Sequence, residues 1–252
     1  MEALSPRSGR WTLTLLAPRG IRVTLDPSWI VFAVLLYWTL DAVVMPFLTP
    51  EIDRQAYRFM AVAGALGIFV LVVLREAVVA LVAARQQVPL DEIRILPVDG
   101  VLRAPPATAS LGQEFLLLAV GTAISALAGL ALLLLLFKAS GPNTPLAVGG
   151  VAFFLGLAAA VHAVVGLLPV SPFAGGRVLG AALARWVTSP TGAARAVRCI
   201  DYAAAAAALA AGLWFLTGAD HERHVGVWLV VAGAVILAYG WPWRAAVERE
   251  PR

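Results

Sequence analysis

One carboxylate lies inside a long apolar segment, where it could take part in hydrolysis. This residue is Glu76, within residues 57–84. In the pattern His-Glu-x-x-His, two imidazoles stand one helical turn apart and bind zinc, and the glutamate beside them serves as a general base. Arg75 and Val79 occupy the two histidine positions of this pattern. We therefore interpret this segment as similar to a zinc-site helix in which both ligands are replaced.

These replacements remove the chemistry that the spacing usually supports. A catalytic zinc needs about three protein ligands and a water molecule. Valine offers no lone pair, and arginine cannot be deprotonated in a protein. Without zinc, water keeps its pKa near about 15.7 instead of about 7. We therefore expect no cofactor and no functional catalytic residue, with Glu76 standing only at the position of a general base.

Asp41 and His162 also lie in apolar segments and could approach Arg75. A charge near the middle of a bilayer costs about 2.5–3.5 kcal/mol on insertion scales, so a buried partner is expected. We predict a polar pocket of Asp41, Arg75, Glu76 and His162, in which Arg75 pairs with one of the two carboxylates or fills the space of a metal. Arg75 and Glu76 need not pair directly, because adjacent helix positions diverge by about 100°.

Two questions about this pocket stay open. It either still recognises a ligand or is held together by a purely structural ion pair. A metal site relocated to Glu76, His162 and Asp41 is the remaining alternative, and zinc would then be the cofactor.

The elements that position these residues are predicted to be membrane-spanning helices. The chain has 252 residues, of which 61% are hydrophobic and 13% are charged. Soluble domains contain about 25% charged residues. Six segments have roughly the 20 apolar residues that cross a bilayer: residues 28–48, 57–84, 113–137, 146–170, 193–217 and 224–243.

The predicted fold class is therefore an all-α membrane protein with about six transmembrane helices. Its expected parts are an N-terminal segment 1–27, a membrane core 28–185 and a two-helix membrane extension 186–252. A short β-hairpin is predicted at 93–103, because polar and apolar residues alternate around Asp99-Gly100. An edge strand there could pair with an extended peptide, or the ribbon only caps the helices.

The distribution of cations predicts an orientation. The chain has 19 lysine and arginine residues. If the N-terminus is cytoplasmic, only Arg54, Arg58, Lys138 and Arg223 fall in loops on the outer side. Cytoplasmic loops are enriched in arginine and lysine, so both termini are expected in the cytoplasm. The arginines fit contacts with anionic lipid better than nucleic acid, since basic runs with interleaved aromatic residues are absent from the sequence.

Three separate segments resemble the site-2 protease family of intramembrane zinc metalloproteases. The first contains Arg75, Glu76 and Val79 and leads into the predicted hairpin. The second contains Gly121, with Thr122 and Ser125 where the family has Pro and Asn. The third, residues 166–179, is the most specific, because it repeats the family's Leu-Leu-Pro-x-x-Pro-x-x-Gly-Gly-Arg spacing at Pro169, Pro172, Gly175, Gly176 and Arg177.

The resemblance covers roughly residues 20–185 and implies a degenerate member of the family. The family binds zinc through the two histidines and through an aspartate before Gly-Gly. The corresponding residues here are Arg75, Val79 and Ala174. The resemblance therefore implies a pseudoenzyme in a bacterial cytoplasmic (inner) membrane, which binds a transmembrane client protein or an active membrane protease. An active metalloprotease with non-standard ligands, carrying out intramembrane proteolysis, is the alternative. A small-solute carrier or channel is a weaker one.

Overall fold

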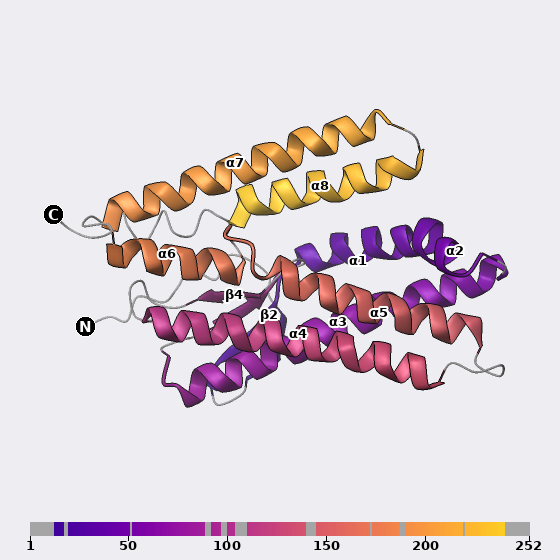
Figure 1. The fold of residues 1–252 in the computed structure, drawn as a ribbon, viewed down its shortest axis with the longest axis horizontal. Helices are drawn as coiled ribbons and strands as arrows, with labels where there is room; N and C mark the ends of the chain where they lie inside the picture. The colour runs from indigo at the N-terminus through magenta and orange to yellow at the C-terminus, as the bar shows by residue number, and fades with distance from the viewer. Residues whose placement is uncertain are drawn as a thin grey trace.

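The computed structural model describes residues 13–17, 20–50, 52–88, 92–96, 100–103, 110–139, 145–171, 173–186, 190–218 and 220–239. Its long helices run side by side along the longest axis of the molecule (Figure 1). The first, α1 (Ser28–Thr39), passes through a π-helical turn, η2 (Leu40–Val44), into the short α2 (Met45–Leu48). It is followed by α3 (Arg54–Arg85), α4 (Leu111–Ala139), α5 (Leu146–Val165), α6 (Ala174–Trp186), α7 (Pro190–Leu216) and α8 (Asp220–Tyr239).

The predicted membrane-spanning segments correspond to helices. Five stretches of the described residues are long and apolar enough to cross a membrane: Ser28–Leu48, Arg54–Arg85, Leu111–Lys138, Leu146–Val165 and Gly192–Leu216. The sixth predicted segment corresponds to α8, which has the length of a span but carries Asp220, Glu222 and Arg223 in its first turn. The structure thus confirms a multi-pass helical fold.

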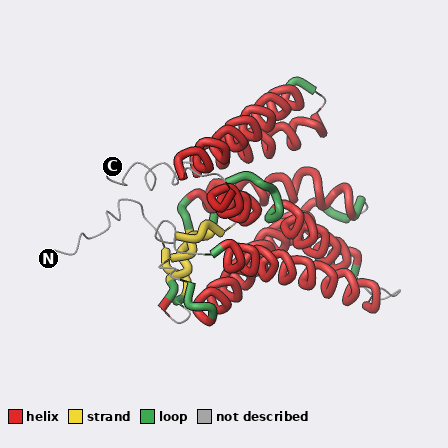
Figure 2. The backbone as a smooth tube through the Cα atoms, turned by 60° about the vertical axis from the view of Figure 1, so that its left-hand side comes forward, coloured by secondary structure: helices red, strands yellow, loops and turns green. Residues whose placement is uncertain are grey.

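A small sheet lies beside the helices (Figure 2). Its strands are β1 (Leu13–Leu16), β2 (Arg22–Leu25), β3 (Glu92–Ile95) and β4 (Gly100–Arg103), in that spatial order. The antiparallel pair β3–β4 confirms the predicted hairpin. Sequence reasoning missed β1 and β2, which lie in the predicted N-terminal segment 1–27. Because β2 pairs in parallel with β3, β3 is an internal strand and β4 is the last strand of the sheet.

The two faces of this sheet differ in chemistry. Val23, Ile93 and Ile95 on one face pack with Val79 and Ala83 of α3 in one hydrophobic cluster. This packing fixes α3, the helix that carries Arg75 and Glu76, against the sheet. Successive residues of a strand point to opposite faces, so Thr24 and Arg94, which are paired between β2 and β3, lie on the other face.

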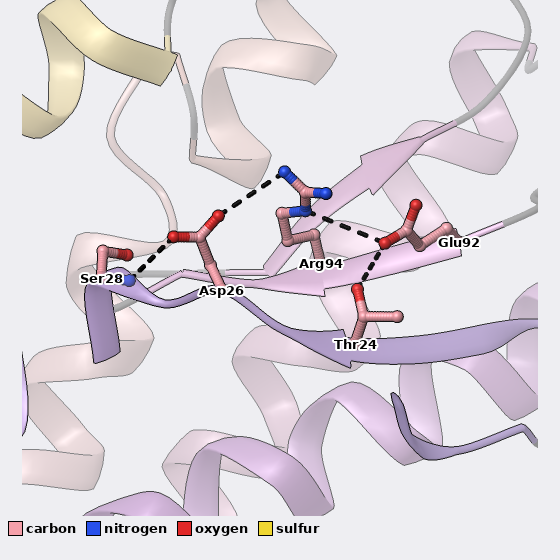
Figure 3. A network of polar contacts seen from close by, with 5 residues as sticks. All are labelled: Thr24, Asp26, Ser28, Glu92 and Arg94. Atoms are coloured by element: carbon pink, nitrogen blue, oxygen red, sulfur yellow. Dashed lines mark hydrogen bonds and ion pairs between the residues drawn. The ribbon is translucent and has the colours of Figure 1, made fainter. Parts of the chain in front are cut away.

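Thr24 and Arg94 belong to a buried polar network that joins the sheet to α1 (Figure 3). The hydroxyl of Thr24 donates to Glu92 Oε1 at 2.5 Å. Arg94 lies between two carboxylates, 3.5 Å from Asp26 Oδ2 and 3.8 Å from Glu92 Oε1. The other oxygen of Asp26 accepts the backbone N–H of Ser28, the first residue of α1, at 3.0 Å. The network therefore fixes where α1 leaves the sheet.

Helices α7 and α8 form a hairpin along one flank of the molecule (Figures 1 and 2). Their backbones approach closely at Gly212 and Gly226, where an added Cβ on either residue would lie under 3.0 Å from the carbonyl oxygen of the other. The hairpin contacts α1 through Trp228, whose indole N–H donates to the hydroxyl of Thr39 at 3.0 Å. The Trp228 ring also packs edge-on against Phe32 at 5.3 Å.

Candidate functional site

Arg75 and Glu76 lie in the C-terminal half of α3 and are both buried. Arg75 is 4% exposed and Glu76 is 1% exposed. The Nη1 group of Arg75 donates to Oε1 of Glu76. Direct pairing of these neighbours was not required by helix geometry, but the long arginine side chain folds back to reach the adjacent carboxylate. Glu76 therefore neutralises the cation at this position.

The guanidinium of Arg75 also contacts two other helices. Its Nε group donates to the carbonyl oxygen of Gly121 in α4 at 3.3 Å. A Cβ added at Gly121 would lie 2.8 Å from Arg75 Nη2, so a glycine makes room for the guanidinium. A Cβ added at Gly166, just after α5, would lie 3.5 Å from the same nitrogen. Arg75 thus links α3, α4 and the end of α5.

Besides Arg75, the residues at the family's zinc-ligand positions are Val79 and Ala174, and both are buried and apolar. Val79, one turn after Arg75, is 4% exposed, and Ala174, the first residue of α6, is 2% exposed. Ala174 is followed by two glycines that allow α6 to pack against the chain segment after α5. A Cβ at Gly175 would lie 2.3 Å from the carbonyl oxygen of Leu167.

The segment after α5 carries the remaining motif positions. The backbone N–H of Gly175 donates to the carbonyl oxygen of Gly166 at 2.9 Å, which closes this segment into a loop. A Cβ at Gly176 would lie 2.5 Å from the carbonyl carbon of Val170, so this glycine also permits a close backbone contact. Pro169 is exposed within the loop, and Pro172 lies outside the described residues.

Arg177 anchors the first turn of α6 to α4. Its Nε group lies 3.3 Å from Oε2 of Glu114, and both side chains are mostly buried. Asp201 of α7 holds the preceding loop, because its Oδ1 atom accepts the buried backbone N–H of Ser171 at 2.8 Å. Neither Glu114 nor Asp201 was selected from the sequence. A lone acid in an apolar segment was the available signal for Asp201.

Asp41 does not join the predicted pocket around Arg75. It lies in η2 and pairs with Arg54, the first residue of α3, at 2.6 Å. Arg54 also donates to the backbone carbonyl of Asp41 at 3.1 Å. Arg54 and Arg75 are separated by about six helical turns, or about 30 Å along α3. The prediction that Asp41 could pair with Arg75 is therefore wrong. His162 lies half-buried in α5, one turn before Gly166.

The residues at this site do not fit a zinc ion. The Arg75 guanidinium occupies the space between α3, Gly121 and Gly166, and Val79 and Ala174 offer no lone pair. Within the described part of the chain, no three His, Cys, Asp or Glu side chains form a group that could hold a metal. The arrangement supplies a fixed, charge-neutral cross-link between helices.

Comparisons with known proteins place the fold. No protein-family model matches the chain, and no curated protein matches it in sequence. Among solved structures, it is similar to the site-2 protease from Methanocaldococcus jannaschii, with a TM-score of 0.60 and 21% sequence identity. The match covers 89% of this chain and 94% of the other. The chain therefore has a site-2 protease-like fold.

Proposed function

We propose that this protein descends from site-2 proteases, has lost their zinc-dependent activity, and binds a membrane protein through the retained scaffold. The single observation that supports the loss is the buried Arg75–Glu76 pair. The carboxylate of Glu76, at the general-base position, is paired with Arg75. The permanent positive charge of Arg75 would repel a divalent metal ion at this site. The expectation that the protein has no catalytic residue and no cofactor follows from this pair.

An active metalloprotease with other ligands has less support. Asp41 is bound to Arg54 at the far end of α3, and Glu76 is bound to Arg75. Two of the three side chains suggested for a relocated site are therefore already paired with arginines, which leaves one imidazole, His162. One imidazole does not make a zinc site. A solute path through Asp41, Arg75, Glu76 and His162 also has less support, because Asp41 is paired with Arg54, about 30 Å along α3 from Arg75.

The proposed partner is a protein with a transmembrane segment, either a client or an active protease. The fold keeps a sheet packed on the helix that carries Arg75. Among the described strands, β4 pairs on one side only, with β3, so an extended segment could add a strand at its other edge. A membrane-protein client has a transmembrane helix that continues into an extended segment where it leaves the bilayer. The helices and the edge of β4 could bind these two parts.

Site-specific photo-crosslinking in cells tests this proposal. A photoreactive residue replaces Val101 in β4, and the matched control replaces Leu134, an exposed residue of α4. We expect a discrete crosslinked protein from position 101, identified by mass spectrometry as a protein with a transmembrane segment, and none from position 134. Equal products from both positions, or none from position 101 at normal expression, would refute the proposal.

A further inference from the structure

Helices α6 and α7 carry an excess of positive charge. In residues 174–218, the basic residues are Arg177, Arg185, Arg195 and Arg198, whereas the one acid is Asp201. Arg177 is paired with Glu114, and Asp201 is buried against Ser171. Arg185, Arg195 and Arg198 form no ion pair with any carboxylate that the structure describes.

These three arginines are accessible and lie toward one end of the α6–α7 pair. Arg185 and Arg195 are exposed and Arg198 is partly exposed. The two helices are antiparallel neighbours (Figure 1), and a Cβ on Gly180 would lie 3.8 Å from Val197 Cγ2. This contact places Arg195 beside residue 182 of α6, so Arg185 lies about 5 Å further along the axis. The three cations thus lie within about 9 Å along the axis, with Arg198 nearest the apolar part of α7.

The apolar length of α7 places this height at the surface of a bilayer. From Arg198 to Leu216 the helix rises about 27 Å, which matches a hydrocarbon core of about 30 Å. Aromatic residues flank the arginines, as is typical of the interface. Tyr202, one turn beyond Arg198 toward the apolar part of α7, is 48% exposed, and Trp186, at the end of α6 on the opposite side of the arginines, is 77% exposed.

We propose that Arg185, Arg195 and Arg198 form a binding site for an anionic phospholipid headgroup, with Tyr202 at its apolar edge and Trp186 at its outer edge. Guanidinium groups bind phosphate through two parallel hydrogen bonds, and in the described part of the chain none of these three forms an ion pair with a carboxylate. The cation distribution along the chain orients this end toward the cytoplasm, where the membrane surface is negative. The inference is independent of the proposed partner protein.

Native mass spectrometry of the purified full-length protein tests the site. The probes are phosphatidylglycerol and phosphatidylcholine with the same acyl chains. The variant carries R185Q, R195Q and R198Q, and the matched control carries R22Q, R58Q and R85Q, which are also exposed arginines without an ion pair among the described residues. We expect each arginine of the site to contribute about five-fold to retention of phosphatidylglycerol, or about 100-fold for the triple variant.

The outcomes distinguish the lipid from other anions. The proposal is supported if the wild type and the control retain phosphatidylglycerol over phosphatidylcholine, and the site variant loses this preference at an unchanged melting temperature. Equal losses in the two triple variants would show a non-specific charge effect and overturn it. Displacement of the lipid by inorganic phosphate at equal concentration would indicate a free-anion site. Unchanged lipid retention in the site variant would assign the arginines to another acidic partner. Either this result or displacement by inorganic phosphate would overturn the lipid proposal.

Discussion

Arg75 and Glu76 are consecutive residues of α3 and are paired with each other in a buried site. The same guanidinium donates to the carbonyl oxygen of Gly121, and a Cβ added at Gly166 would lie 3.5 Å from its Nη2 atom. The guanidinium of Arg75 therefore links α3 to α4 and lies beside the end of α5.

The first prediction concerns this pair. Arg75→Leu should lower the free energy of unfolding by about 3–5 kcal/mol, because it leaves the Glu76 carboxylate buried without its partner. Adding Glu76→Gln should restore most of this loss. Adding Asp41→Asn should not, since Asp41 pairs with Arg54. Unfolding in mixed micelles provides the measurement, analysed as a double-mutant cycle. Equal stability of Arg75→Leu and the parent would contradict the buried-pair explanation.

The second prediction uses the close contact at Gly121. Gly121→Ala places a Cβ 2.8 Å from Arg75 Nη2 and should displace the guanidinium, at a cost of about 1–3 kcal/mol. Gly149→Ala is the control, because its Cβ would meet Leu136 at an ordinary 3.7 Å. Both variants are compared by thermal unfolding. If Arg75→Met reduces the effect of Gly121→Ala, the clash is with Arg75; an undiminished effect would mean that another neighbour is responsible.

The third prediction is that the purified protein contains no stoichiometric zinc. The ligand positions hold Arg75, Val79 and Ala174, which cannot coordinate the ion. Elemental analysis by mass spectrometry measures the metal directly. A variant with Arg75→His, Val79→His and Ala174→Asp, which places zinc-binding side chains at these positions, gives a positive control for uptake. About one zinc per unaltered chain, lost on His162→Ala, would instead establish a relocated site.

The fourth prediction separates catalysis from structure at Glu76. A zinc protease whose general base is removed loses about 10²–10⁴-fold in rate. In this protein we expect Glu76→Gln to reduce stability, through the unpaired Arg75, without any specific loss of a cellular function once protein levels are matched. Function and level are measured in the same cells, with Arg75→Leu as the comparison. Complete loss of function in Glu76→Gln at normal levels, with Arg75→Leu retaining function, would identify catalysis.

The long helices could be predicted from the sequence because each contains an apolar segment close to the thickness of a bilayer. The hairpin was also predictable, since its turn residues and its alternation are local. Strands β1 and β2 were not, because each has four residues and β2 is held by a parallel partner far away in the sequence. Local periodicity carries no information about such pairing.

The candidate site was only partly predictable for a similar reason. Residue types identified Arg75 and Glu76, but their hydropathy did not decide which carboxylate Arg75 would bind. Proximity in the sequence favours an ion pair between Asp41 and Arg54, because a short connection joins α2 to the start of α3. The contact between Arg75 and Gly121 depends on how α3 packs against α4. Local sequence patterns do not specify this packing.

The fifth prediction concerns Asp201, which connects the C-terminal hairpin to the loop after α5. Its Oδ1 atom accepts the backbone N–H of Ser171 at 2.8 Å, and both residues are buried. Asp201→Ala leaves this N–H without its acceptor, which costs about 1–3 kcal/mol. Hydrogen exchange of the Ser171 amide should therefore accelerate about ten-fold or more. Asp201→Asn keeps an acceptor oxygen and should change exchange much less. Asp53→Ala, which removes the cap of α3 far from this loop, is the control. Equal acceleration in all three variants would mean that exchange reports global unfolding, and that Asp201 does not hold the loop.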